Sequence, residues 1–176
     1  MALKPLKLQL KQSKDFKYFR FSDFFDYERG KRLTKENQIA GDIAYISSTA
    51  INNGIDNYIT PPSYMKVYHN KLTLSNSGSV AYLFYHDYEF VASDHVMVIW
   101  AKDFELSKYI ALFLKPIFER IRYRYNLYAY GRKFNQTRIK ETKLLLPAKI
   151  NDQQQYIPDW LYMENYIKSL PYADLI

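Results

Sequence analysis

The middle of the chain alternates short hydrophobic runs with polar turn signals such as Asn52-Asn53-Gly54 and Pro61-Pro62. Runs of this length, separated by Asn, Gly and Pro, predict successive strands and hairpins. Their close spacing predicts an antiparallel or mixed sheet that is twisted and partly barrel-like. The runs cover residues 43–46, 71–74, 80–85, 89–92 and 96–100.

The spacing of hydrophobic residues becomes helical after residue 106. Between Ser107 and Tyr125 one apolar stripe follows the i, i+3, i+4, i+7, i+11 pattern, and Lys and Arg occupy the opposite side. Pro116 lies inside this segment and is expected to kink the helix or limit its first part. A closing strand is predicted at 143–146, ahead of Pro147. The stripe consists of Ile110, Phe113, Leu114, Ile117 and Ile121.

The C-terminal part of the chain predicts one more helix. Residues 151–156 are polar and linker-like, and Pro158 is suited to the first position of a helix. Apolar residues then follow at spacings of 3, 4 and 3, which predicts a seam that packs either on the chain's own domain or on a helix of a partner. We therefore divide the chain into a domain at 1–150 and a linker with a spacer-type helix at 151–176. The seam consists of Trp160, Met163, Ile167 and Leu170.

Length and composition indicate one globular domain with a mixed α/β (α+β) fold. The chain has 176 residues, 48% of them hydrophobic, and its mean hydropathy is negative. It has no cysteine, which excludes disulfides and thiolate nucleophiles. We find no segment suited to a signal peptide or a membrane span, so we expect a cytoplasmic protein that does not enter a membrane.

Charge is distributed in blocks along the chain, which has a formal net charge of +7. Residues 1–40 carry ten Lys or Arg against five Asp or Glu, and residues 106–149 carry eleven against two. The segment 41–105 between them and the segment 150–176 after them are acidic. Two basic blocks around an acidic, strand-rich centre predict a basic face, and such a face attracts nucleic acid by releasing counterions.

Three polar segments are candidates for contacts with DNA: 30–34, 47–54 and 130–138. Cations and hydroxyl groups suit phosphates, whereas amides, hydroxyls and Arg can read the edges of bases. For each segment alone, a solvated loop is the plainer interpretation. The candidate phosphate ligands are Lys31, Arg32, Thr34, Lys133 and Arg138. The candidate base-reading residues are Ser48, Thr49, Asn52, Asn53, Tyr130, Arg132 and Asn135.

An active site in this chain is not expected. A metal-dependent nuclease could use Asp94 with the pair Glu141 and Lys143, but tripeptides of the form Glu-x-Lys are frequent by chance. The three histidines lack metal-ligand spacing, so we predict neither catalytic residues nor metal ligands. A methyltransferase is excluded because 60–64 lacks the amide or carboxylate of the catalytic motif.

Several ordered motifs together resemble the target recognition domain of restriction–modification specificity subunits, in type I systems and the related type IIB and IIG systems. The resemblance covers about residues 16–170. Its motifs are Phe19-x-Phe21-x-Asp23-x-Phe25, Gly30-Lys31-Arg32-Leu33-Thr34, Gly41-Asp42-Ile43-x-Tyr45-Ile46-Ser47, Asn53-Gly54-Ile55, Leu74-Ser75-x-x-Gly78-Ser79, Phe90-x-Ala92-x-Asp94, Gly131-x-x-x-Asn135-x-x-x-Ile139-Lys140, Leu144-x-Leu146-Pro147 and Pro158-Asp159-x-x-x-Met163-x-x-Tyr166-Ile167.

The resemblance implies a small α/β domain that reads part of a double-stranded DNA target through the major groove and ends in a helix that pairs with another spacer helix. It implies methyltransferase and restriction partners, as subunits or fused domains, that carry S-adenosylmethionine and Mg, with no cofactor in this chain. The chain has one recognition domain rather than two. It is therefore interpreted as a half-subunit that forms a homodimer through its C-terminal helix, a separate subunit, or a fragment of a fused enzyme. A nuclease and a general nucleic-acid-binding module stay as alternatives.

Overall fold

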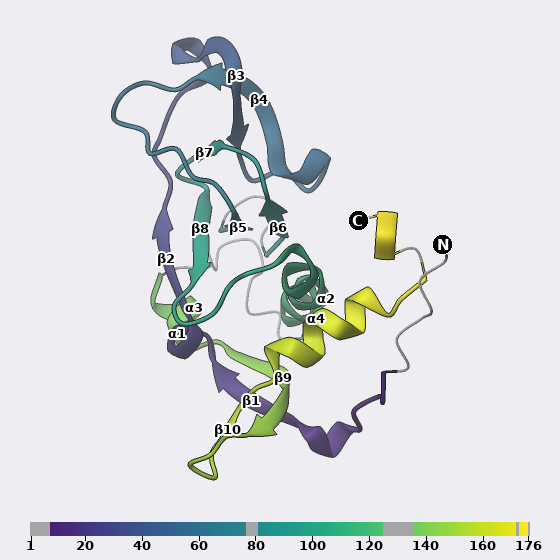
Figure 1. Ribbon diagram of the computed structural model, residues 1–176. Helices are drawn as coiled ribbons and strands as arrows, with labels where there is room; N and C mark the ends of the chain where they lie inside the picture. The colour runs from purple at the N-terminus through teal and green to yellow at the C-terminus, as the bar shows by residue number, and fades with distance from the viewer. Residues whose placement is uncertain (1–7, 77–80, 125–135, 172, 176) are drawn as a thin grey trace.

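The computed structural model describes residues 8–76, 81–124, 136–171 and 173–175. These residues form three small sheets, with helices packed beside two of them (Figure 1). Two of the sheets and the helices make one continuous unit with a single large core, which we call the body. The third sheet lies at one end of the molecule, and we call it the distal sheet. No sheet among the described strands closes into a barrel.

The aromatic run near the N-terminus forms two strands joined by a single helical turn. Strand β1 spans Phe16–Arg20, α1 spans Phe21–Phe24 and β2 spans Phe25–Arg29. Phe21 and Phe25 are almost fully buried, and their rings stack with centroids 5.1 Å apart. Burying two Phe side chains at the turn fixes the direction in which the chain passes from one sheet of the body to the next.

A four-stranded antiparallel sheet runs through the centre of the body in the order β2-β8-β5-β6. Its other strands are β5 (Lys71–Ser75), β6 (Leu83–His86) and β8 (Val96–Ala101). Most of their buried positions are apolar, because α2 and the distal sheet cover parts of the strands on different sides, and Thr73, Ser75 and His86 are the polar exceptions. The strands expected at 71–74 and 96–100 are confirmed, and the one expected at 80–85 is seen from residue 83.

Helix α2 spans Lys108–Arg124, as the helical stripe predicts, and its buried Leu114 and Phe118 belong to the core of the body. Pro116 lies inside the helix, which stays continuous through it. Helix α4 (Trp160–Lys168) packs against α2 in Figure 1. No described helix is long and apolar enough to cross a membrane.

The third element of the body is the sheet β1-β9-β10, which joins the two ends of the sequence. After α3 (Gln136–Glu141), strand β9 spans Lys143–Ile150 and β10 spans Tyr156–Pro158. β9 continues past Pro147, where the sequence predicted its end, because that residue's carbonyl still accepts a bond from the amide of Asp159 (2.9 Å). The polar segment predicted as a linker forms the turn of the β9–β10 hairpin.

The distal sheet places β3 (Ile39–Ile46) between the antiparallel β4 (Ile55–Thr60) and the parallel β7 (Phe90–Ala92). Both faces of the C-terminal end of β3 are buried, since Ala44 and Ile46 belong to one small apolar cluster and Tyr45 to another. The loop that joins β3 to β4 therefore projects from a strand end that is held on both edges and both faces.

Candidate nucleic-acid interface

The loop between β3 and β4, residues 47–54, has a defined backbone. The amide of Ser47 donates to the carbonyl of Gly54 (2.9 Å), and the amide of Gly54 donates to the carbonyl of Ile51 (3.0 Å). Asn52, Asn53 and Gly54 have φ angles of 50°, 51° and 81°. Asn and Gly are the residues that best tolerate this left-handed region, so the Asn-Asn-Gly sequence explains why the loop turns here.

The loop offers some of its predicted base-reading groups to solvent and keeps one inside. Ser48 and Thr49 are half-buried and Asn52 is exposed. Asn53 instead donates from Nδ2 to the carbonyl of Tyr85 and to the hydroxyl of Tyr88, both at 3.0 Å. The structure therefore gives the donor group of Asn53 partners within the protein, where the sequence assigned it to a base.

A buried histidine lies behind this loop. The ring of His86 is fully buried, with Nδ1 2.8 Å from the hydroxyl of Tyr88 and Nε2 2.7 Å from Oγ1 of Thr73. Burial lowers the pKa of His86 to about 3, so the ring is neutral at physiological pH. Burial also raises the pKa of Tyr88, which keeps its hydroxyl protonated. Sequence analysis missed this network because its members are distant in the chain.

The segment that carries Lys31 and Arg32 lies against the distal sheet and is anchored there. The amide of Gly30 donates to the carbonyl of Val96 (3.0 Å), and the amide of Lys31 donates to the carbonyl of Ala92 (2.9 Å). A Cβ at position 30 would fall well inside van der Waals contact with that Ala92 carbonyl, so glycine is required. The side chains of Lys31 and Arg32 are exposed.

The same segment is held along its further course by side chains. The hydroxyl of Tyr45 donates to the carbonyl of Leu33 (3.2 Å), and Nδ2 of Asn37 donates to Oγ1 of Thr34 (2.9 Å). Thr34, which the sequence predicts as a phosphate ligand, thus already accepts a bond within the protein. Residues 30–34 thus form an anchored strip from which the side chains of Lys31 and Arg32 are exposed.

The two described candidate segments lie on different sides of the distal sheet. In Figure 1 the connection that leaves β2 climbs along the left of this sheet, and the 47–54 loop lies at its right, beside β6. Four residues of the third candidate segment, Tyr130, Arg132, Lys133 and Asn135, lie outside the described residues. Arg138 belongs to α3, but its side chain is outside the description as well.

A cleft of about 330 Å³ opens beside the 47–54 loop, between β6 and α2. Asn53 and Tyr85 line one side of it, and Lys108 and Lys115 come from α2. Nζ of Lys115 lies 3.0 Å from the carbonyl of Leu83 and 3.1 Å from a carboxylate oxygen of Glu119. The charge of Lys115 is therefore already balanced within the protein.

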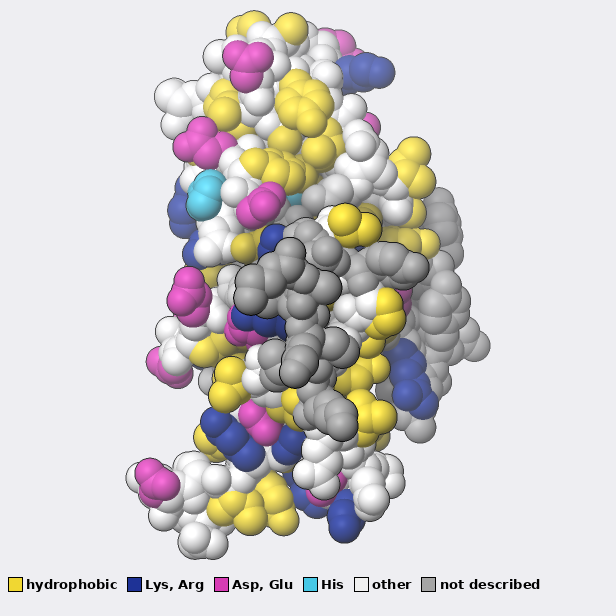
Figure 2. Space-filling model, turned by 45° about the vertical axis from the view of Figure 1, so that its right-hand side comes forward, with side chains coloured by type: hydrophobic (Ala, Val, Ile, Leu, Met, Phe, Trp, Pro, Cys, Tyr) yellow, Lys and Arg dark blue, Asp and Glu magenta, His cyan; other side chains and the backbone are white. Residues whose placement is uncertain are grey.

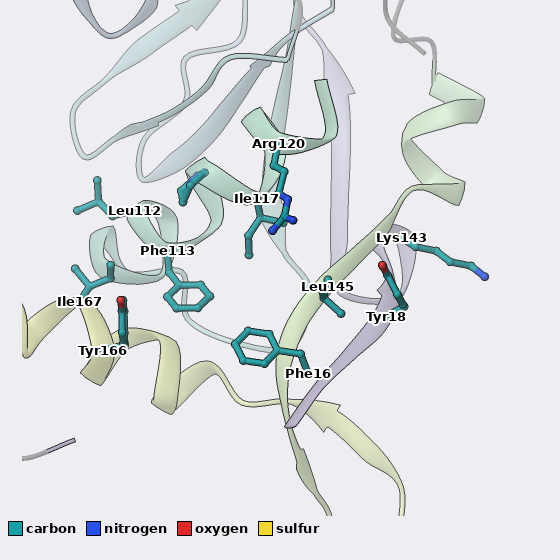
Figure 3. Close-up of a pocket in the computed structure, with 11 residues that line it drawn as sticks. Phe16, Tyr18, Leu112, Phe113, Ile117, Arg120, Lys143, Leu145, Tyr166 and Ile167 are labelled. Carbon is teal, nitrogen blue, oxygen red and sulfur yellow. The ribbon is translucent and has the colours of Figure 1, made fainter. Parts of the chain in front are cut away.

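A second groove, of about 270 Å³, lies between α2, α4 and the β1–β9 sheet (Figure 3). Figure 3 shows Phe16 and Leu145 pointing toward it from the sheet and Phe113 from α2. Arg120 and Lys143 add positive charge to its lining. Nothing in the hydrophobic spacing of the sequence indicates this groove, because its walls come from three distant segments.

The seam of the C-terminal helix faces the chain's own core. Met163 is fully buried and Ile167 is 8% exposed, while the Trp160 ring stacks on Phe104 with centroids 4.0 Å apart. Leu170, the last residue of the predicted seam, is 40% exposed. Of the two alternatives for this seam, the structure shows packing on the chain's own domain for Trp160, Met163 and Ile167.

The carboxylates of the nuclease alternative lie apart. Asp94 sits in the turn before β8, where Oδ2 is 3.6 Å from Nη2 of Arg29. Glu141 and Lys143 lie by α3, at the opposite end of β8 in Figure 1, and six extended residues span about 20 Å. Among the described residues no group of three or more His, Asp or Glu side chains could hold a metal ion.

Charged side chains are mixed on the face in Figure 2, where Lys and Arg stand among Asp and Glu. Ion pairs among the described residues include Lys66 with Glu28 and Lys168 with Glu164. The part of the basic block that lies between 121 and 138 has no described side chains. The predicted basic face is thus represented among the described residues by separate exposed cations.

Comparison with known proteins gives consistent matches. The model of the type I restriction modification DNA specificity domain matches residues 13–170. The specificity subunit S.BcgI of a type II restriction enzyme from Heyndrickxia coagulans is 36% identical over 160 residues, which make up 90% of this chain and 45% of that protein.

Two solved structures share the fold. The S subunit of a type I restriction-modification system from M. genitalium has a TM-score of 0.66 at 13% identity, over 92% of this chain and 39% of that one. The HsdS subunit from Thermoanaerobacter tengcongensis has a TM-score of 0.56 at 12% identity, over 94% and 38%. This chain spans less than half the length of these relatives. Since the family model covers nearly the whole sequence, the chain belongs to the family of type I restriction modification DNA specificity domains.

Proposed function

We propose that this chain binds double-stranded DNA and reads part of a target site for a restriction–modification system. The observation that carries the proposal is the family match over residues 13–170, together with 36% identity to a specificity subunit. The chain supplies an ordered loop with exposed polar groups and a separate strip with two exposed cations. Such a division between base-reading and phosphate-binding groups is typical of sequence-specific DNA binding.

The partners in this proposal are a DNA methyltransferase and a restriction protein, as subunits or as fused domains. They would supply S-adenosylmethionine and Mg, and this chain would choose the site without catalysing a reaction. The cytoplasm, where cellular DNA is accessible, would be the place of action.

Pairing of α4 with a second copy of the chain would have to use its outer side. Leu161 is 64% exposed and Leu170 40% exposed, whereas Met163 is in the core. We therefore propose that a homodimer through this helix would form its contact with these exposed residues alone. Size-exclusion chromatography with light scattering on the wild type and on Leu161→Glu tests it: a dimer that Leu161→Glu leaves intact would place the contact elsewhere.

Selection from a pool of DNA duplexes with a randomised centre tests the proposed function. The purified chain should enrich one short motif, and its binding should weaken steeply with salt because Lys and Arg displace counterions from phosphates. Enrichment of no motif, with equal affinity for single strands, would instead support a general nucleic-acid-binding module. Metal-dependent cleavage by the isolated chain would support the nuclease.

The variant Lys31→Ala distinguishes contacts with phosphates from contacts with bases. The exposed ammonium of Lys31 is suited to a phosphate, so its loss should weaken binding about equally for all sequences and reduce the slope of log K against log salt by about 1. Titrations at several salt concentrations, with the enriched duplex and a scrambled one, measure this. Lys149→Ala, which removes an exposed cation from β9, is the matched control.

A further inference from the structure

The left-handed backbone of the 47–54 loop needs an external support. Asn52 and Asn53 have φ near 50°, and Gly54 follows with φ at 81°. A residue other than Gly adopts this left-handed conformation at a cost of about 1 kcal/mol or more. The backbone bonds within the loop, from Ser47 and Gly54, close it but do not attach it to the body. The attachment comes from one side chain, that of Asn53.

The hydrogen bonds of Asn53 continue as a series of donor–acceptor pairs that leads into the core. Nδ2 of Asn53 donates to the oxygen of Tyr88, so the hydroxyl hydrogen of Tyr88 is left to donate to Nδ1 of His86. The neutral ring of His86 then carries its hydrogen on Nε2 and donates to Oγ1 of Thr73. This order gives each of these polar atoms a partner of the right kind, and it fixes the tautomer of the histidine.

The far end of the chain of bonds is rigid. Thr73 lies in β5, the strand of the body that is paired with β6 on one side and with β8 on the other, and it is 1% exposed. His86 is further held by the ring of Phe90, whose centroid lies 4.6 Å away. The loop is thereby connected to the body at two points: the carboxamide of Asn53 donates to the carbonyl of Tyr85 in β6, and it donates to the hydroxyl of the half-buried Tyr88, whose bonds continue to His86 and Thr73.

We propose that Tyr88 is a positioning residue for base recognition: together with the carbonyl of Tyr85 it holds Asn53, and it so helps to fix the loop that carries Ser48, Thr49 and Asn52. Tyr88 itself does not face the DNA in this proposal. The inference rests on the proposed function, because positioning matters only if the loop reads bases. Loss of the hydroxyl should lower discrimination between sequences and leave the charge-driven affinity for any duplex unchanged, since exposed Lys and Arg provide the latter.

Tyr88→Phe tests the proposal, because it removes one hydroxyl and keeps the ring. The ratio of affinities for the enriched duplex and a scrambled duplex should fall about five- to ten-fold, the value of one well-placed hydrogen bond. Affinity for the scrambled duplex should stay within two-fold. Tyr162→Phe is the matched control: its hydroxyl accepts a bond from the amide of Lys11 (3.1 Å), far from the loop, and its removal should leave the ratio as in the wild type.

Asn53→Gly provides the second variant, since glycine keeps the left-handed backbone and loses the carboxamide. The combined change Asn53→Gly with Tyr88→Phe should reduce the ratio no more than Asn53→Gly alone, because Tyr88 acts on the loop through Asn53. Additive losses, or a Tyr88→Phe chain that keeps the full ratio of the wild type, would overturn the inference. A wild-type chain that binds every duplex alike would overturn the proposed function itself, and the inference with it.

Discussion

The body and the distal sheet are held together by different means. The body has one large apolar core in which Phe21, Leu114 and Met163, from three distant segments, are all fully buried. The distal sheet has two small apolar clusters on the two faces of β3. It is joined to the body by one of these clusters, which includes Val96 and Val98 of β8, by backbone bonds at Gly30 and Lys31, and by the polar network behind Asn53. The first region depends on one large core, and the second on small clusters supplemented by a few specific contacts.

This difference explains how one fold can support different loops. Apolar packing in the body tolerates substitutions that keep volume, so the framework can persist while sequences diverge. The specific contacts of the distal sheet hold its loops in place without extending through them, which leaves exposed positions such as Ile51 free to vary. Loops on a rigid scaffold are where binding residues usually occur.

Phe21→Ala should have the largest effect, because it empties the core of the body. Phe21 is fully buried and contacts Phe25 and Phe118, and truncation of such a residue costs about 4 kcal/mol. Thermal unfolding should occur roughly 10 °C lower for a chain of this size. Phe21→Leu, which retains most of the volume, should recover more than half of the loss, and equal losses for the two variants would contradict a packing role.

Gly30→Ala should destabilise the chain by about 2 kcal/mol, through overpacking rather than loss of volume. The added methyl group would press on the carbonyls of Ala92 and Ser93 and disturb the bonds that attach the segment to β7 and β8. In this variant, hydrogen exchange of the backbone amides at position 30 and at Lys31 should therefore become faster, before exchange in the body does. Uniform quickening through both regions would show that they unfold as one unit.

Acidification should lower the free energy of unfolding through the protonation of His86 in the unfolded chain. Its pKa is lowered to about 3 in the folded protein, so between pH 6.5 and 3 the unfolded chain takes up a proton that the folded chain does not. The free energy of unfolding therefore falls as the pH falls, by about 2 kcal/mol from this residue at pH 5. Urea unfolding at pH 7 and pH 5 measures it. His86→Gln, which cannot titrate, should show a pH dependence smaller by that amount, and an unchanged dependence would sink the assignment.

Asp159→Ala should have the smallest effect, on the order of 1 kcal/mol, and should be confined to the body. Oδ1 of Asp159 accepts the amide of Tyr162 (3.1 Å) and so caps α4, while Oδ2 lies 3.0 Å from Nζ of Lys11. Chemical denaturation would measure the loss. Asp159→Asn keeps the capping oxygen and should retain most of the stability, so a loss equal to that of Asp159→Ala would assign the effect to the ion pair.

Local spacing in the sequence predicted the elements whose burial is decided by near neighbours. The stripe from Ile110 to Ile121 predicted α2, and the runs at 71–74 and 96–100 predicted two central strands, because each spacing identifies the buried face directly. The family and the mixed fold were also predictable, from the order of motifs from Phe19 to Ile167. The continuation of β9 past Pro147 was not, since residues 148–150 pair with β10, which follows only after the turn.

The roles of individual side chains depended on partners that the sequence does not bring together. Asn53 has the same local sequence whether its amide faces DNA or Tyr88, which lies 35 residues away. The seam at Met163 has the same spacing for a partner helix and for α2. Gly30 resembles any turn glycine until Ala92 is placed against it. The contacts of these side chains could be assigned only once the three-dimensional structure placed their partners beside them.

The parallel pairing of β3 with β7 also bears on how the chain is made. A ribosome produces β3 and β4 well before β7, so the edge of β3 that β7 will cover is without its partner for the time needed to synthesise β5 and β6. An unpaired edge with Ala44, Tyr45 and Ile46 is a template for association with other nascent chains. Pairing between segments so distant in sequence is also slow. Expression yield should therefore be more sensitive to changes at this edge than the stability of the finished protein is.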